Sequence, residues 1–181
     1  MRLQQSRHFL GCALIGASLL LSACGFQLRG TGGASIGLDA LHVSAQDNHS
    51  PTRQQLVETL RSSGVAVSDS ARYQLQLLAE PVQRRAVSYA RRSTPAEYEL
   101  TRSLVFQIAD REGRPLIGPE TLTARRAYAA DRDNLVASGE EEALLQREMG
   151  EDLVRQLMFR LSGISSSDLA NREHAIERPA D

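Results

Sequence analysis

Apolar side chains at every second position are the feature that most constrains how this chain can fold. They recur from Tyr73 to Ala79, resume through Val87 and Tyr89, and appear again in 98–108. A last strand is marked by Thr121, Leu122, Thr123 and Tyr128. Because successive side chains of a strand point to opposite faces, this period predicts half-buried β-strands. Short links between consecutive strands favour antiparallel pairing.

Pro81 interrupts the first of these stretches. A proline has no N–H to give to a strand ladder, so we expect a bulge or a sheet edge at this position. A further strand is predicted at Leu38–Ala45, where Leu41 and Val43 share one face. The sequence therefore predicts about four strands.

Two helices are indicated by caps and by apolar spacing. Ser50 and Pro51 suit a helix start, and Gly64 suits its end, which predicts a helix over Pro51–Ser63. Ser138 with Glu141 fits a capping box, so the acidic run 140–142 is interpreted as a helix start rather than a metal or catalytic site. The second helix then carries an apolar residue at every fourth position, at Leu145, Met149, Leu153, Leu157 and Leu161, and ends at Gly163.

The order of these elements is strand, helix, three strands, helix. It predicts an α+β fold, a two-layer sandwich of about four mostly antiparallel strands with two helices on one face. The other face would be partly free to meet a partner and would carry the polar side chains, including several arginines. We expect this domain to cover 38–164, and the polar segment 165–181 to be disordered.

The N-terminus has the features of a bacterial lipoprotein precursor. Positive charge at Arg2 and Arg7 precedes an apolar run, Phe9–Leu21, which ends in Leu-Ser-Ala-Cys24. This pattern predicts a signal peptide over 1–23, a lipid-modified Cys24 and a Gly-rich tether over 24–37. An ordinary secretory peptide or a retained membrane anchor are the alternatives. Cys12 leaves with the signal peptide, so no thiol remains for a disulfide.

Charge narrows the choice of ligands. The net charge is -1, which argues against a general nucleic-acid binder. All 21 basic residues are arginine, whose planar guanidinium can hold phosphate or carboxylate through two hydrogen bonds. The middle of the chain is rich in them, at Arg84, Arg85, Arg91, Arg92, Arg102, Arg125 and Arg126.

Catalytic patterns are hard to find. His42, His49 and His174 have no ligand spacing to one another, and the sequence has neither a Gly-rich phosphate loop nor a nucleophile elbow. Asp131 and Asp133 suit a solvated turn better than an acid–base pair. The sequence therefore predicts a protein that is not an enzyme and has no cofactor or metal.

Three short motifs resemble one known family. Residues 24–30, Cys-Gly-Phe-Gln-Leu-Arg-Gly, are similar to the mature N-terminus of the LptE (RlpB) lipopolysaccharide-assembly lipoproteins. Ala96-Glu97-Tyr98 before a middle strand and Arg147-Glu148-Met149 in the last helix also resemble that family. The resemblance covers Cys24 to about Ile164.

The resemblance implies a non-enzymatic partner of a large outer-membrane β-barrel, LptD. Members of the family sit in the barrel lumen as a plug, help the barrel assemble and help deliver lipopolysaccharide to the cell surface. It implies a lipid anchor in the outer membrane, on its periplasmic side. Consistent with this, residue 25 is Gly rather than the Asp that retains lipoproteins at the inner membrane. A generic outer-membrane lipoprotein scaffold and a lipid-anchored hydrolase are the competing classes.

The resemblance also suggests a lipopolysaccharide contact at Arg91 and Arg92, in the loop before Ala96, where family members carry a basic residue. The alternative is that both are solvated hairpin charges or contacts to the barrel wall. A second basic position of the family falls at Ser138 in this chain. Arg125 or Arg126 on the neighbouring strand could take its place.

Overall fold

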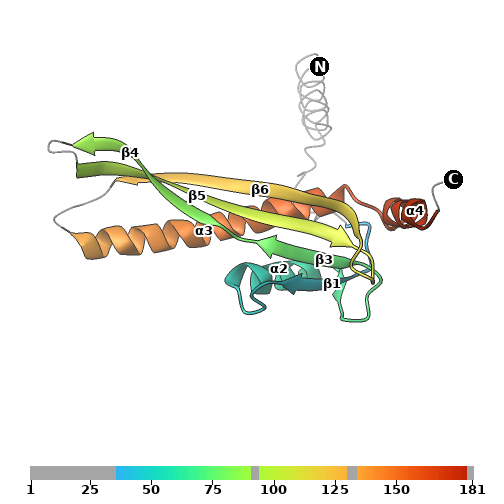
Figure 1. The fold of residues 1–181 in the computed structure, drawn as a ribbon. Helices are drawn as coiled ribbons and strands as arrows, with labels where there is room; N and C mark the ends of the chain where they lie inside the picture. Colours follow the sequence, from blue (N-terminus) through green and yellow to red (C-terminus); the bar gives the residue numbers. More distant parts are fainter. Residues whose placement is uncertain (1–35, 91–93, 130–133, 179–181) are drawn as a thin grey trace, which may run out of the picture. The chain divides into compact units, whose positions relative to one another are not determined.

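The structure is a computed structural model that describes residues 36–90, 94–129 and 134–178. The predictions for the signal peptide, Cys24, most of the tether, Arg91, Arg92, Asp131 and Asp133 lie outside these residues. Ala34–Asp181 form one compact unit. Its elements, in order, are β1 (Ala40–Ala45), α2 (Pro51–Ser62), β2 (Ala66–Val67), β3 (Gln74–Ala79), β4 (Val82–Ala90), β5 (Thr94–Ala109), β6 (Pro115–Ala129), α3 (Leu135–Ser162) and α4 (Ser166–Glu177) (Figure 1).

One six-stranded sheet runs through the unit, centred on the long strand β5. β6 pairs with one edge of β5, while β3 and β4 follow one another along its other edge. All three pairings are antiparallel, as predicted. β1 pairs in parallel with both β3 and β2, because helix α2 is a crossover that returns the chain in the same direction. The α+β class is confirmed, but the sheet has more strands than the four we expected.

The break between β3 and β4 falls at Glu80-Pro81. The register with β5 shifts just before it, between Leu77 and Ala79. The bulge predicted from Pro81 is therefore present. Within the described residues, β1 continues the sheet beside β3 alone, so the outer edge of β4 has no neighbouring strand.

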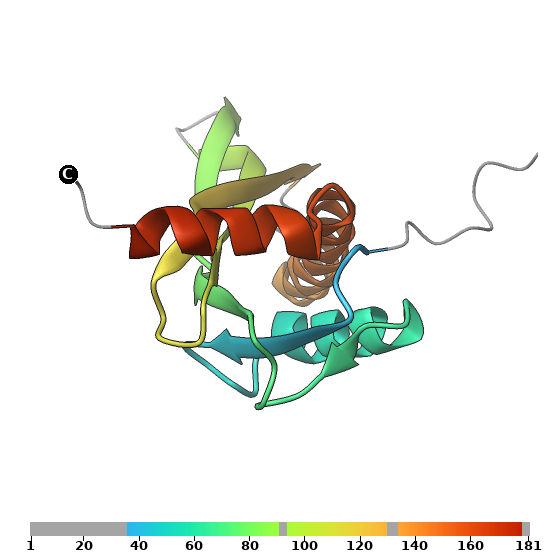
Figure 2. The ribbon, with the colours of Figure 1, turned by 90° about the vertical axis from the view of Figure 1, so that its right-hand side faces the viewer.

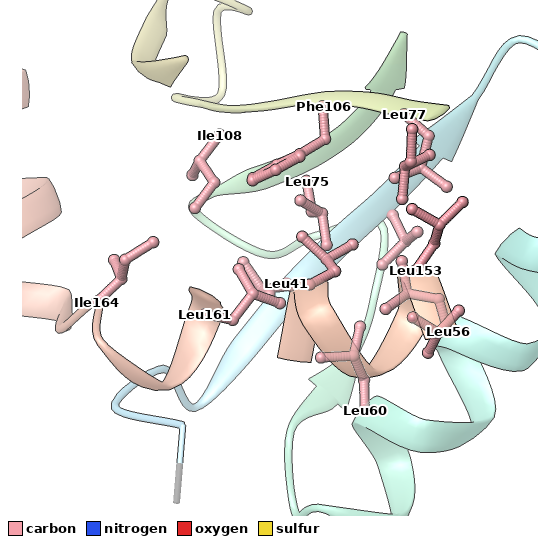
Figure 3. Packing of buried hydrophobic residues seen from close by; sticks show 14 of the residues in the cluster. Leu41, Leu56, Leu60, Leu75, Leu77, Phe106, Ile108, Leu153, Leu161 and Ile164 are labelled. Carbon is pink, nitrogen blue, oxygen red and sulfur yellow. The ribbon is translucent and has the colours of Figure 1, made fainter. Parts of the chain in front are cut away.

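Helices α2 and α3 pack against one face of the sheet; in Figure 2, α3 is seen nearly end-on and α2 from the side. The core between them is almost entirely aliphatic. Leu56 and Leu60 of α2 and Leu153 of α3 meet Leu75 and Phe106 of the sheet (Figure 3). The stripe predicted along α3 is buried at Met149, Leu153, Leu157 and Leu161. α2 begins as expected, with the Ser50 hydroxyl accepting a hydrogen bond from the Arg53 N–H at 3.2 Å.

Helix α3 begins one turn earlier than predicted. Its N-cap is Asn134, whose Oδ1 accepts from the Ala137 N–H at 3.1 Å. Ser138 lies inside the helix. Asn is as good an N-cap as Ser, and nothing in 135–137 opposes a helix, so the first available cap starts it.

The prediction that 165–181 is disordered is wrong over Ser166–Glu177, because these residues form helix α4. Ser165 and Asp168 make a capping box, and Leu169 is completely buried. Glu173 receives two hydrogen bonds from the Arg72 guanidinium, the shorter at 2.7 Å. A cap, one buried leucine and ion pairs from Arg72 to Glu173 and from Arg114 to Glu177 thus hold a helix that has no apolar stripe.

Candidate functional site

The two faces of the sheet differ sharply in chemistry. On the helix side, Leu100, Leu104 and Phe106 of β5 are fully buried. The side chains between them, among them Thr101 and Ser103, point the other way and are partly exposed. We call this second surface the open face. It carries the polar members of the alternating pattern, as predicted.

Side chains on the open face are linked by hydrogen bonds. The hydroxyls of Ser103 and Thr123 are 3.2 Å apart across β5 and β6. The amide of Gln107 donates to Gln76 at 2.7 Å, and Gln76 donates to Gln74 at 3.0 Å. This surface therefore offers hydroxyl and amide groups rather than an apolar patch.

The five arginines on the described strands divide by face and by partner. Arg126 points to the helices and pairs with Asp152 of α3. Arg84 pairs with Glu142 at 3.0 Å, and Arg102 with Glu80 at 3.1 Å. Their positive charges are thus compensated inside the protein.

Arg85 and Arg125 occupy the open face. Arg85 pairs with Glu99 at 3.2 Å, whereas the Arg125 side chain has no hydrogen bond or ion pair within the described residues. A shallow hollow of about 410 Å³ lies between them, lined by Gln83, Arg85, Glu99, Thr101 and Arg125. Of the two arginines that could replace the missing basic position, only Arg125 is free for a ligand.

Arg102 has a structural role that its place among the arginines in the middle of the chain does not reveal. It donates to the Gln146 carbonyl at 2.7 Å and to the Thr52 hydroxyl at 2.8 Å, as well as to Glu80. It thereby joins β5, α2 and α3. Gly150 makes room for it, since a Cβ there would lie 3.0 Å from the guanidinium.

A second cluster joins the β4–β5 hairpin to the start of α3. Tyr98 and Tyr128 stack with ring centres 5.7 Å apart, and the Arg84 guanidinium lies over Tyr98. The Tyr128 hydroxyl donates to Glu142 at 2.6 Å. That hydrogen bond, with the Arg84 ion pair, lowers the pKa of the Glu142 carboxyl, while burial raises the pKa of Tyr128.

This cluster, Arg84–Tyr98–Tyr128–Glu142, fixes the strands that lead to the predicted lipopolysaccharide contact. β4 and β5 stay paired out to Ala90 and Thr94, so Arg91 and Arg92 belong to the three-residue link between them.

The described residues contain no group of three or more His, Cys, Asp or Glu side chains placed to hold a metal ion. Among the helices in this part of the chain, none has both the length and the apolar character needed to cross a bilayer.

Fold and site together define an α+β domain with a helix-covered face and an open polar face. The family model described as LptE, lipopolysaccharide-assembly, matches residues 38–161. The chain belongs to this family, which confirms the resemblance seen in the sequence.

Individual relatives agree. The LPS-assembly lipoprotein LptE of Pectobacterium atrosepticum is 29% identical over 96% of both chains. A solved minor lipoprotein from Acinetobacter baumannii is 28% identical with a TM-score of 0.60, covering 69% of this chain and 91% of its own. The rare lipoprotein B from Shewanella oneidensis is 26% identical with a TM-score of 0.57, covering 77% and 99%.

Proposed function

We propose that this chain is a non-enzymatic, lipid-anchored subunit of the outer-membrane lipopolysaccharide translocon. In this role it plugs an LptD-like β-barrel, assists the barrel's assembly and helps deliver lipopolysaccharide to the cell surface. The observation that carries the proposal is the family match over 38–161, which spans the whole sheet and all but the last residue of helix α3.

The open face supports a place inside a barrel. Transmembrane barrels are apolar outside and polar within, so a plug has to present polar groups to the wall. Hydroxyls, amides and guanidiniums on the open face can meet such a wall, whereas an apolar face could not.

Cys24 is the proposed anchor. The several acyl chains of a mature lipoprotein hold a membrane firmly, while one chain binds only marginally. A short tether over 24–37 would then keep the domain at high effective concentration beside its barrel.

Arg91 and Arg92 are the proposed lipopolysaccharide contact, since guanidinium groups bind phosphate with two hydrogen bonds. Replacing both by Ala should weaken lipopolysaccharide binding by the full-length protein, and the loss should shrink at high salt because added ions screen the charge. The fold should be unchanged. Unaltered binding in the double variant would remove this assignment.

The partner proposal is tested by extraction in mild detergent followed by affinity capture of the full-length protein. We expect a large β-barrel in stoichiometric amount. Capture of a lone monomer would favour the alternative, a generic outer-membrane lipoprotein scaffold of the cell envelope.

A further inference from the structure

We propose that the hollow on the open face binds the phosphorylated saccharide part of a glycolipid, with Arg125 as the cation that holds its phosphate. The inference rests on the proposed function, under which the glycolipid is lipopolysaccharide. The acyl chains of the glycolipid would lie outside this hollow.

Among the arginines on the described strands, Arg125 has no ion-pair partner. The other four arginines on the described strands each have a carboxylate within 4 Å. In the hollow, Glu99 is engaged by Arg85, so one positive charge, that of Arg125, is left uncompensated. An anionic ligand would supply the missing partner through a bidentate contact.

The strand register brings three of the lining residues of the hollow side by side. Gln83, Thr101 and Arg125 are direct neighbours across β4, β5 and β6. With strands about 4.8 Å apart, the Cα atoms of the two outer residues are about 10 Å from each other. Arg85 lies two residues along β4 from Gln83, beside Glu99. Long side chains thus rise on both sides of the short Thr101, which forms the floor of the hollow.

The lining of the hollow combines hydrogen-bond donors with acceptors. Arg125 donates, Thr101 and Gln83 both donate and accept, and the Glu99 carboxylate accepts. A phosphate alone offers no hydrogen-bond donor to the Glu99 carboxylate, whereas a sugar hydroxyl can donate to it. The set therefore suits a phosphate carried on a hydroxyl-rich ring, and its volume falls within the range of small-molecule sites.

The surroundings point the same way. Beyond the hollow, the next open-face groups on β5 and β6 are the linked hydroxyls of Ser103 and Thr123, then Val105 with Thr121. Gln107 follows on β5 and donates to Gln76 of β3. The hydroxyls and amides can hydrogen-bond further sugars but offer little apolar area to acyl chains.

The test titrates the full-length protein, in mild detergent, with lipopolysaccharide backbone from which the acyl chains have been removed and the phosphates kept. We expect saturable binding that weakens about tenfold in Arg125→Gln, the effect of losing one charge-assisted hydrogen bond. Arg125→Lys should recover only part of the affinity, because an ammonium cannot form the bidentate contact.

Arg147→Gln is the matched control, because it removes an exposed arginine from helix α3, in the other layer. It should bind as tightly as the unaltered protein. Equal binding by Arg125→Gln, or equally tight binding of a dephosphorylated backbone, would overturn the proposal. So would an Arg125→Gln variant that keeps saccharide binding but loses barrel capture, since Arg125 would then contact the barrel wall rather than a saccharide phosphate.

The saccharide titration needs no barrel, and barrel capture needs no saccharide. Failure of this site and failure of the proposed function are therefore seen in separate experiments.

Discussion

Arg102 shows what a single charged residue does inside this fold. It lies at a helix-facing position of β5, between the buried Leu100 and Leu104. The alternating pattern already places it on that face, which was the available signal for a structural role. What the sequence could not supply was its partners, because Glu80, Thr52 and Gln146 come from three other segments.

Replacing Arg102 by Ala should lower the free energy of unfolding by about 3 kcal/mol, the lower end of the range for breaking a buried ion pair, since both side chains keep some exposure. The Arg102→Met, Glu80→Gln double variant should recover part of that loss, because no unpaired charge remains. Urea unfolding measures both. A loss no larger than that of the exposed Arg147→Ala would contradict this role.

Glu142 gives a pH dependence whose sign follows from its lowered pKa. The stabilisation by its ionised form is complete above the ordinary value of 4.5 and is lost as the pH falls through the lowered pKa. Glu142→Gln should therefore be less stable than the unaltered protein at pH 7, and the gap should narrow as the pH drops below 4.5.

Denaturant unfolding at a series of pH values checks this. Glu148, which is exposed on the same helix, provides the control variant Glu148→Gln, with little effect expected at neutral pH. A gap for Glu142→Gln that stays constant on acidification would show that its carboxylate does not carry the stabilisation.

Whether a helix could be predicted depended on how strong its local sequence pattern is. Helix α3 was found because its apolar stripe recurs over many turns, although the first turn was missed when two caps competed. Helix α4 was missed because its described residues include only one buried leucine, and one of its ion pairs joins Arg72 to Glu173, about a hundred residues apart. Contacts at that range leave no local signal.

Leu169→Ala should cost about 2 kcal/mol or more of unfolding free energy, because it leaves a cavity under α4. Ile176→Ala, on the same helix, removes a side chain that is 46% exposed and should change stability by less than about 0.5 kcal/mol. Thermal or urea unfolding distinguishes them. Equal effects from the two variants would mean that α4 does not dock through Leu169.

For the whole molecule, the sequence predicted the class and the open face but not the full sheet. β2 has only two residues and pairs with β1 across helix α2, so no period reveals it. The hollow was equally hidden, because it depends on the register that aligns Gln83, Thr101 and Arg125 on three strands. The arginine count indicated anion binding, whereas the structure showed which of the five arginines on the described strands has no hydrogen-bond or ion-pair partner.

We propose that this family member serves lipopolysaccharide delivery from a lipid-anchored position. The most direct measurement is the arrival of newly made lipopolysaccharide at the surface of cells depleted of the protein. We expect arrival to fail on depletion, to recover with the full chain, and not to recover with Cys24→Ala. Normal arrival of lipopolysaccharide in depleted cells would contradict the account.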